Sequence, residues 1–381
     1  MDDRVWLETA TPPVLGKERR CRTSRCQRPP FSRRALVLLC TELNVESEMP
    51  MVHLDEYSRA INYLRVSVTD RCNLRCTYCM PPKGVPWQPH SSMLSFEHIE
   101  TVVRAAAELG ISKVRLTGGE PLVRLGIVEL VRMLACVPGV DDLAMTTNGT
   151  LLAGCAAELC QAGLRRVNVS LDTLRAERCH SITRLGRLED VLAGIAAAHE
   201  AGLRPVKINT VVMRGANDDE VLDLALKSVD AGWNVRFIEY MPVGVKAPAD
   251  AAWSSQVVTG EEMQHSIEAR FGPLVPTQAS VGNGPARYYR IAGAQGTLGF
   301  ITPVSEHFCV HCNRLRLTAD GQLRPCLLSD QEIDLRSALR QGADVHEIKR
   351  LLLEGIHSKP REHQLAGCVQ PEKRAMSQIG G

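Results

Sequence analysis

The sequence lacks both a strong net charge and a long apolar run. It contains 45 Lys and Arg residues against 43 Asp and Glu residues, which gives a formal net charge of +2. This balance argues against a broad attraction to nucleic acid or to a membrane surface, so an anionic ligand must be held by a few placed Arg and Lys side chains. No run of about 18 apolar residues is present, and we therefore expect no membrane-spanning helix.

Cysteine, in contrast, is abundant, with 14 in 381 residues. Secreted disulfide scaffolds are short and dense in cysteine throughout, whereas six of these cysteines lie in two tight clusters and the others are scattered. We therefore interpret the clusters as metal ligands in a reducing compartment, the cytoplasm. We expect the scattered cysteines, such as Cys136 and Cys179, to be small buried apolar residues.

Residues 1–55 differ from the rest of the chain. They contain Arg-rich stretches and Pro29-Pro30 but no sustained periodicity. We expect either a disordered leader or a start codon assigned too early. Regular patterning begins just after Met49 and Met51, either of which would be a sensible start.

From residue 61 onward, short apolar strands alternate with longer amphipathic segments. We predict the strands Tyr63–Val68, Lys113–Thr117, Leu143–Thr147, Arg166–Leu171, Val206–Val212 and Val235–Glu239. The helices predicted between them are Phe96–Leu109, Ile127–Cys136, Leu151–Ala162, Arg187–Ala201 and Asp219–Ala231. The alternation indicates an α/β fold with parallel strands and right-handed crossovers. We predict that residues 56–242 form a partial (β/α)6 TIM-like barrel, with a doubly wound sheet as the alternative. In both folds the chemistry belongs at the carboxyl ends of the strands.

The alternation stops after about residue 242. Residues 243–381 form a second predicted region, which is rich in β-structure and loops and contains the second cysteine cluster. It includes one helical stretch, Val345–Leu353, and a polar tail that ends in Gly380-Gly381.

The first cluster, Cys72, Cys76 and Cys79, follows the first predicted strand with the spacing C-x3-C-x2-C. Three thiolates can bind three irons of a 4Fe–4S cubane, which leaves the fourth iron open to a chelating cosubstrate. A zinc site with His53 or His90 as the fourth ligand is the alternative. Zinc loops favour paired C-x2-C units, so the spacing favours iron and sulfur.

A glycine-rich turn, Thr117–Pro121, ends the second predicted strand. Its glycines permit a close approach of another backbone segment, and Glu120 offers a carboxylate to an ammonium group. An isolated turn of this kind is more often only a turn. Its position one strand after the cysteine loop favours a binding site.

The second cluster, Cys309, Cys312 and Cys326, has the spacing C-x2-C-x13-C and again no evident fourth cysteine. From spacing alone, an iron–sulfur site and a zinc knuckle with His311 or His307 as the fourth ligand are equally supported.

Arg314 and Arg316 alternate after the second of these cysteines, so on an extended segment they point to one face. Planar guanidiniums beside an open metal site would suit a polyanionic substrate, because they bind phosphate in a bidentate manner. A solvated basic edge is the alternative.

The cysteine loop and the glycine-rich turn resemble those of the radical SAM superfamily, and Tyr78 matches its adenine-contacting aromatic residue. Together with the second cluster, residues 58–381 closely resemble the GTP 3′,8-cyclases of molybdenum cofactor biosynthesis. The matching motifs are Arg65–Cys72, Arg115–Pro121, Thr146–Gly149, Asn168–Asp172, Arg236–Glu239, Cys309–Arg316, Cys326 and Gly380-Gly381.

The resemblance implies two 4Fe–4S clusters, one on each cysteine triplet, each with one open iron. S-adenosylmethionine would bind the first cluster and contact Tyr78, Gly119, Ser170 and Met241. The guanine base of GTP would bind the second cluster. The other residues implied to surround GTP are Arg65, Arg115, Thr146, Lys207, Arg314 and Arg316. The implied catalytic residues are Cys72, Cys76, Cys79, Arg314 and Arg316.

In such enzymes a 5′-deoxyadenosyl radical abstracts the 3′ hydrogen of GTP, and the ribose then closes onto C8 of guanine. The implied product is (8S)-3′,8-cyclo-7,8-dihydroguanosine 5′-triphosphate, and the glycine tail is implied to project into the active site. The implied partners are an electron donor of the flavodoxin or ferredoxin type and, downstream, cyclic pyranopterin monophosphate synthase. A homodimer is compatible with the sequence, and neither nucleic acid nor membrane is expected as a partner. Two alternatives are another radical SAM enzyme with an auxiliary cluster and a zinc-dependent nucleic-acid-binding protein.

Overall fold

The computed structural model describes residues 53–241, 243, 253–278, 284–363 and 373–380. The predicted leader therefore lies almost wholly outside the described residues. Residues 50–381 form one compact unit. Within the described segments no helix combines the length and the apolar character that crossing a membrane requires.

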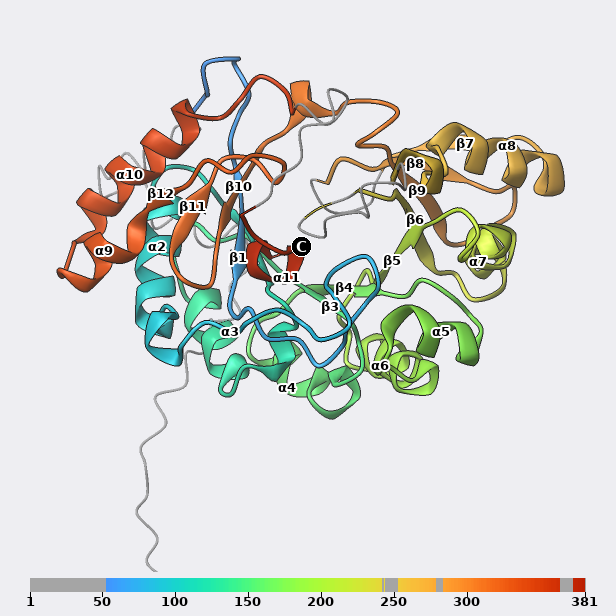
Figure 1. The fold of residues 1–381 in the computed structure, drawn as a ribbon, viewed down its shortest axis with the longest axis horizontal. Helices are drawn as coiled ribbons and strands as arrows, with labels where there is room; N and C mark the ends of the chain where they lie inside the picture. Colours follow the sequence, from blue (N-terminus) through green and yellow to red (C-terminus); the bar gives the residue numbers. More distant parts are fainter. Residues whose placement is uncertain (1–52, 242, 244–252, 279–283, 364–372, 381) are drawn as a thin grey trace, which may run out of the picture. The chain divides into compact units, whose positions relative to one another are not determined.

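A curved parallel sheet with helices on its outer face forms the first half of this unit (Figure 1). Its strands are β1 (Tyr63–Ser67), β2 (Lys113–Thr117), β3 (Asp142–Thr147), β4 (Arg166–Ser170), β5 (Lys207–Val212) and β6 (Asn234–Glu239). Each strand pairs in parallel with the next one along the chain. The helices between them are α2 (Phe96–Glu108), α3 (Ile127–Ala135), α4 (Ala156–Gln161), α5 (Ala176–Thr183), α6 (Leu188–Glu200) and α7 (Val221–Asp230).

The sequence prediction of these elements is largely confirmed, with three differences. Helix α5 was not predicted, because Cys179 and Ile182 are its only buried residues and its apolar pattern is correspondingly weak. The predicted helix Leu151–Ala162 is divided into a 3-10 turn at Leu152–Gly154 and α4. Helix α7 begins at Val221, after a separate 3-10 turn.

The strands of the second region extend this sheet at both edges. β9 (Thr297–Ile301) pairs in parallel with β6, and β8 (Arg287–Arg290) and β7 (Val275–Thr277) follow it in antiparallel order. At the other edge β10 (Arg314–Leu317) pairs in parallel with β1 and is followed by antiparallel β11 (Gln322–Arg324) and β12 (Ile333–Asp334). The complete order is β12-β11-β10-β1-β2-β3-β4-β5-β6-β9-β8-β7. The strand–helix alternation ends near residue 242 because antiparallel neighbours need no crossover helix.

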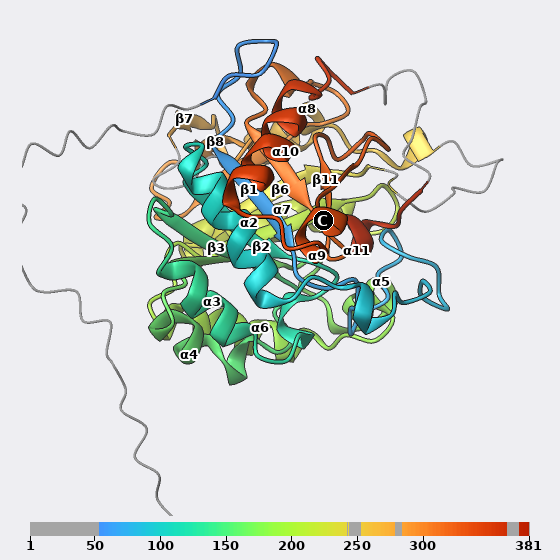
Figure 2. The same ribbon diagram turned by 90° about the vertical axis from the view of Figure 1, so that its left-hand side faces the viewer.

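The remaining helices are α8 (Gly260–Phe271), α9 (Leu335–Arg340), α10 (Val345–His357) and α11 (Met376–Ile379). Helix α10 packs beside α2 on the outer side of the sheet (Figure 2). The described sheet is open, since β7 and β12 are edge strands. Because β1 to β6 are neighbours in chain order and their helices lie on one face, the prediction of a partial TIM-like barrel is confirmed over the doubly wound alternative.

Side chains alternate along the central strands between a hydrophobic core and the inner face of the sheet. Leu64 and Val66 of β1 are fully buried in the core that the outer helices cover. The residue between them, Arg65, points to the opposite side because successive side chains of a strand alternate. Among the scattered cysteines, Cys179 is buried as predicted, but Cys136 is exposed on the turn after α3.

Candidate active site

One cavity on the inner face of the sheet is lined by every residue that the sequence predicted for the site. From the first triplet, the turns and the strand ends these are Cys72, Cys76, Cys79, Tyr78, Gly119, Thr146, Ser170 and Met241. The basic residues and the second triplet add Arg65, Arg115, Lys207, Arg314, Arg316, Cys309, Cys312 and Cys326. The cavity includes the carboxyl ends of the parallel strands, where Gly119, Ser170 and Met241 lie, as this class of fold predicts. It also extends along the inner face of the sheet to the first residues of β4 and β5, Arg166 and Lys207.

The first cysteine loop is held in place by the unpredicted helix α5. The backbone N–H groups of Arg75 and Thr77 donate to the carbonyl oxygens of Thr183 (3.0 Å) and Ile182 (2.9 Å). Arg184, which follows the helix, donates from Nη1 to the Arg75 carbonyl oxygen at 2.6 Å. These contacts position a loop that contains no regular secondary structure of its own.

The glycine-rich turn joins β2 to the same loop. Gly119 donates from its backbone N–H to the Thr69 carbonyl oxygen at 2.7 Å. A Cβ atom at Gly119 would lie 2.3 Å from the carbonyl oxygen of Arg71, so only glycine permits this approach.

The buried carboxylate of Glu120 stabilises the glycine-rich turn through hydrogen bonds. Its Oε1 accepts from the Thr147 hydroxyl (2.7 Å) and the Leu122 N–H (3.1 Å), and its Oε2 accepts from the Asn148 N–H (2.6 Å). Burial raises the pKa of Glu120 to about 7. The carboxylate has three protein donors, and its expected contact with an ammonium group stays a prediction.

Tyr78 is fixed by a buried acid at the carboxyl end of β4. Its hydroxyl donates to Asp172 Oδ2 at 2.7 Å, while Asp172 Oδ1 accepts from the Val211 N–H at 2.9 Å. Burial raises the pKa of Asp172 to about 6. The aromatic ring is therefore held at the cavity wall in one orientation.

Three arginines lie side by side across neighbouring strands. In the sheet register Arg65 of β1 is the partner of Arg115 on β2 and of Arg316 on β10. Burial, together with repulsion by Arg115 and Arg314, lowers the pKa of Arg65 to about 10. Like charges in adjacent positions repel each other, so this row suits an anion in the cavity.

Arg65, Arg115 and Arg316 are called the arginine row below. The phenol of Tyr63 accepts a hydrogen bond from Arg115 Nε. Burial alone would raise its pKa, but the nearby charges of Arg115 and Arg65 outweigh burial and lower it. Sequence analysis missed Tyr63, although it lies two residues before Arg65 and therefore on the same face of β1.

Positive charge exceeds negative charge throughout the cavity. Eight Lys and Arg side chains line it, against the two carboxylates of Glu120 and Asp172. Arg236 is buried on β6, and its Nε and Nη2 atoms have no hydrogen-bond partner among the described residues. Burial and the charges of Arg236 and Arg166 lower the pKa of Lys207 to about 7. A polyanion would accept from these two nitrogens of Arg236 and would offset the charge of Lys207.

The second cysteine triplet is associated with positive charge. Burial would raise the pKa of Cys312, but Arg314 and Lys359 outweigh burial and lower it to about 6. Cys312 is distinctive in this respect, because burial raises the pKa of Cys309 in the same triplet and raises that of Cys72 in the first triplet to about 11. A metal must displace protons at the first site, whereas Cys312 already favours the thiolate that a metal requires.

The sulfurs of the two cysteine triplets are not grouped tightly in the described residues. Among the described residues, the only three His, Cys, Asp or Glu side chains whose ligand atoms lie within 4.8 Å of one another are His307, Cys309 and His363. Neither cysteine triplet forms such a group, although the sulfurs of each triplet influence one another's pKa. One zinc ion binds sulfur at about 2.3 Å, so neither triplet is arranged tightly around a single ion in the described residues.

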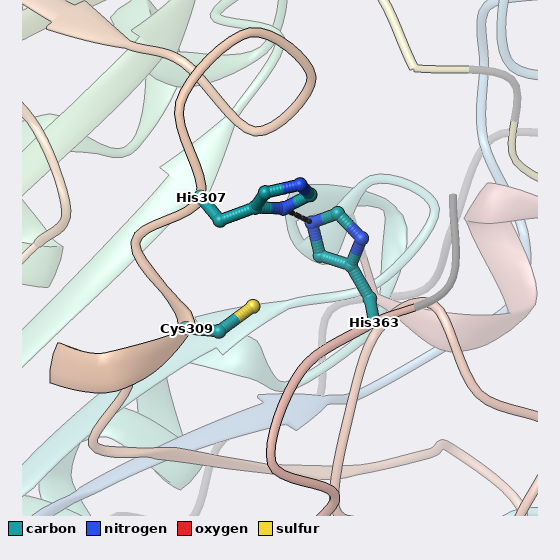
Figure 3. Close-up of side chains that lie close together, drawn as sticks. All are labelled: His307, Cys309 and His363. Carbon is teal, nitrogen blue, oxygen red and sulfur yellow. Dashed lines mark hydrogen bonds between the residues drawn. The ribbon is translucent and has the colours of Figure 1, made fainter. Parts of the chain in front are cut away.

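Figure 3 shows His307 and His363 with their rings in contact above the sulfur of Cys309. His307 Nδ1 lies 3.1 Å from His363 Nε2. His307 was one of the two candidate fourth ligands, with His311, in the zinc alternative, and His363 was not anticipated from the sequence. A single ion on these three residues would compete with the cysteine triplet for Cys309.

The described part of the glycine tail contacts Arg316, a residue that lines the cavity. Gly380 adopts a left-handed conformation with φ of 82°, and its carbonyl oxygen accepts a hydrogen bond from Arg316. Gly381 lies outside the described residues.

Comparisons with known proteins agree with this site. Residues 66–227 match the family model of the radical SAM superfamily, and residues 233–365 match the model named Molybdenum Cofactor Synthesis C. The GTP 3′,8-cyclase of Pelotomaculum thermopropionicum is 55% identical over 329 residues, which cover 86% of this chain and 99% of the relative. The GTP 3′,8-cyclase of Moorella thermoacetica is 51% identical over 328 residues, with coverages of 86% and 99%.

Solved structures share the fold at much lower identity. Streptococcus suis SuiB bound to S-adenosylmethionine aligns with a TM-score of 0.51 and 14% identity, over 76% of this chain and 68% of SuiB. Native anSMEcpe with bound AdoMet aligns with a TM-score of 0.50 and 14% identity, over 78% of this chain and 81% of that protein. The full-length relatives and the two family models confirm the resemblance first inferred from the motifs, and the chain therefore belongs to the GTP 3′,8-cyclase family within the radical SAM superfamily.

Proposed function

We propose that this chain converts GTP to (8S)-3′,8-cyclo-7,8-dihydroguanosine 5′-triphosphate, the first step of molybdenum cofactor biosynthesis. The observation that supports it best is one cavity lined by two cysteine triplets and eight basic side chains. A radical source and a polyanionic nucleotide would need these two features in a single enclosed space.

Cys72, Cys76 and Cys79 would hold a 4Fe–4S cluster with one open iron for S-adenosylmethionine. When bound, this pair supplies a 5′-deoxyadenosyl radical. Tyr78, held by Asp172, offers a fixed aromatic face for the adenine. The other implied contacts, Gly119, Ser170 and Met241, line the same cavity.

The basic residues would bind and orient the triphosphate. Arg65, Arg115 and Arg316 present adjacent guanidiniums, which bind phosphate oxygens in a bidentate manner. Lys207 on β5 and Thr146 on β3 lie farther round the same wall. Binding an anion here would relieve the repulsion among the buried cations, and this relief would contribute to the affinity for the anion.

Cys309, Cys312 and Cys326 would hold the second 4Fe–4S cluster, whose open iron would take the guanine base. Arg314 lies beside Cys312 and lowers the pKa of its thiol. The site would thereby position the purine relative to the ribose, and positioning is a large contribution to rate in such reactions.

Anaerobic turnover tests the proposal. Reduced protein with S-adenosylmethionine should consume GTP, and iron analysis should give about eight irons per chain for two cubanes. Replacing Cys309, Cys312 and Cys326 with alanine should leave S-adenosylmethionine cleavage in place and abolish GTP cyclisation. Unchanged GTP beside active cleavage in the wild-type protein would favour another radical SAM activity.

A zinc-binding protein is the second hypothesis, and the group His307, Cys309 and His363 is the observation that favours it. It predicts zinc, no sulfide and a colourless protein after anaerobic purification.

The proposed GTP cyclase would act in the cytoplasm with a flavodoxin or ferredoxin as electron donor. Its product would pass to cyclic pyranopterin monophosphate synthase.

A further inference from the structure

Lys359 is a buried lysine that sequence analysis did not anticipate. It lies two residues after the end of α10, and its side chain is almost fully enclosed, with the residue 3% exposed. Burying an ammonium group is costly unless it is hydrogen-bonded, so its partners indicate what it does.

The second cysteine site has three arms, the chain segments that contain Cys309, Cys312 and Cys326. The ammonium of Lys359 connects the Cys312 and Cys326 arms. Its Nζ donates to the carbonyl oxygen of Arg314 at 2.8 Å and to that of Pro325 at 2.8 Å. Arg314 lies two residues after Cys312, and Pro325 immediately precedes Cys326. A hydrogen bond with the Cys312 side chain adds a third partner, which uses the full donor capacity of a lysine.

The residues next to Lys359 support the remaining cysteine. Arg59 donates from Nη1 to the carbonyl oxygen of Cys309 at 2.9 Å and from Nη2 to that of Pro360 at 2.8 Å. The backbone N–H of His363 donates to the Cys309 side chain. The segment Lys359–His363 therefore contacts all three arms of the cysteine site.

We propose that Lys359 is a positioning residue of the second cysteine site, where its ammonium holds the Cys312 and Cys326 arms together and stabilises the reduced state of a bound cluster. The inference rests on the second cluster of the proposed function. Reduction adds one electron to a site held by thiolates, so a fixed positive charge and a hydrogen bond to sulfur favour the reduced form and raise the potential.

The test isolates the second cluster by replacing Cys72, Cys76 and Cys79 with alanine. In this parent, Lys359→Met removes the charge with little change of volume, and Lys359→Gln keeps a donor for one carbonyl. Lys349→Met is the matched control, because Lys349 lies on α10 in a surface ion pair with Glu108. Each protein is loaded anaerobically and titrated with reductant while the cluster is followed by electron paramagnetic resonance.

At the potential where the parent is half reduced, the reduced-to-oxidised ratio of the Lys359 variants should fall about tenfold, equivalent to about 59 mV for one electron. Lys349→Met should titrate like the parent. Loss of the second cluster from a Lys359 variant with native circular dichroism would also support the proposal, through the positioning role.

Normal loading with an unchanged midpoint in both Lys359 variants would overturn the inference. General unfolding of both variants would also overturn it, because Lys359 would then support the whole fold rather than this site. A parent that binds no iron would instead overturn the proposed function, and with it the inference.

Discussion

Arg316 on β10 donates a hydrogen bond from Nη1 to the carbonyl oxygen of Gly380 at 2.7 Å. The contact joins the arginine row to the last described residue of the chain. A backbone oxygen thus accepts from a guanidinium that is expected to contact the triphosphate. The tail and the nucleotide site are therefore physically coupled.

Replacing Gly380 with alanine should uncouple the glycine tail from the nucleotide site. A Cβ atom there would lie 2.9 Å from Ser67 Cβ and 3.0 Å from Thr117 Cγ2, and the φ of 82° adds strain of about 1–3 kcal/mol. We expect GTP turnover to fall at least tenfold, with unchanged iron content and unchanged S-adenosylmethionine cleavage in the absence of GTP.

Gly342→Ala is the control for a positive φ without the steric contacts of the tail. Gly342 has the same φ of 82°, but nothing lies within 4 Å of the position that a Cβ atom would occupy there. It should retain wild-type turnover. Equal losses in the two variants would show that strain alone, and not the position of the tail, explains the effect.

Arg374 anchors the tail on the β10–β11 side of the cavity. Its two terminal nitrogens donate to the two oxygens of Asp320 at 3.0 Å each, and its Nε donates to Glu332 Oε1 at 2.6 Å. Arg374→Ala would leave two poorly exposed carboxylates without this cation. We expect the free energy of unfolding to fall by about 3 kcal/mol in denaturant titrations.

Arg132, in an exposed ion pair with Glu129, provides the comparison for Arg374. Arg132→Ala should leave the unfolding midpoint almost unchanged, since exposed pairs contribute little. A stable Arg374→Ala protein would mean that the tail is held mainly by its apolar residues.

Two buried arginines of the cavity should differ in how methionine substitution changes the stability of the protein. Arg166 is paired with Asp142 through Nε at 3.0 Å and through Nη2, whereas two nitrogens of Arg236 have no partner among the described residues. Arg166→Met should lower the free energy of unfolding by about 3 kcal/mol. Arg236→Met should leave it unchanged or higher, because a poorly compensated buried charge is removed.

Binding measurements separate stability from function at Arg236. If its free donors bind the nucleotide, Arg236→Met should weaken GTP binding at least tenfold, as measured by isothermal titration calorimetry. A destabilised variant with full GTP affinity would indicate a purely structural role for this arginine.

The lowered pKa of Lys207 predicts that the protein takes up a proton when it binds the nucleotide. Burial and nearby cations lower its pKa to about 7 in the free protein, so at pH 8 most molecules have a neutral amine. A bound triphosphate favours the ammonium form and raises the pKa. GTP binding at pH 8 should therefore take up a proton, and uptake should disappear at pH 6, where the amine is already charged.

Calorimetry in two buffers of different ionisation enthalpy measures this uptake. Lys207→Met should abolish the buffer dependence at pH 8. Proton release, or uptake that persists in the variant, would place the titrating group elsewhere.

The same shift has a consequence for stability. Between pH 7 and 10.5 the unfolded chain binds more protons at Lys207 than the folded protein does. The contribution of Lys207 to stability therefore increases as pH rises through this window. Lys207→Met should remove that part of the slope.

The barrel strands could be predicted from the sequence because each combines an apolar core face with a polar inner face. Arg65 between Leu64 and Val66 shows the pattern, and the same alternation would have found Tyr63. The row formed by Arg65, Arg115 and Arg316 could not be predicted, because it depends on β10 pairing with β1 across about 250 residues. No local pattern specifies that pairing.

The residues that hold the two cysteine sites in place could not be predicted from the sequence either. Helix α5 has a weak apolar face and is fixed by its contacts with the cysteine loop. Lys359 is recognisable only through two carbonyl groups from distant segments. Thiol spacing in the sequence indicates which residues bind a metal, whereas the groups that tune those thiols come together only in the folded chain.

The most direct test of the proposed activity follows a single hydrogen atom. GTP with deuterium at the 3′ position is incubated anaerobically with the reduced protein and S-adenosylmethionine, and the 5′-deoxyadenosine formed is analysed by mass spectrometry. We predict that deuterium appears in 5′-deoxyadenosine in step with GTP consumption. Unlabelled 5′-deoxyadenosine with intact GTP would contradict the assignment of GTP as the substrate.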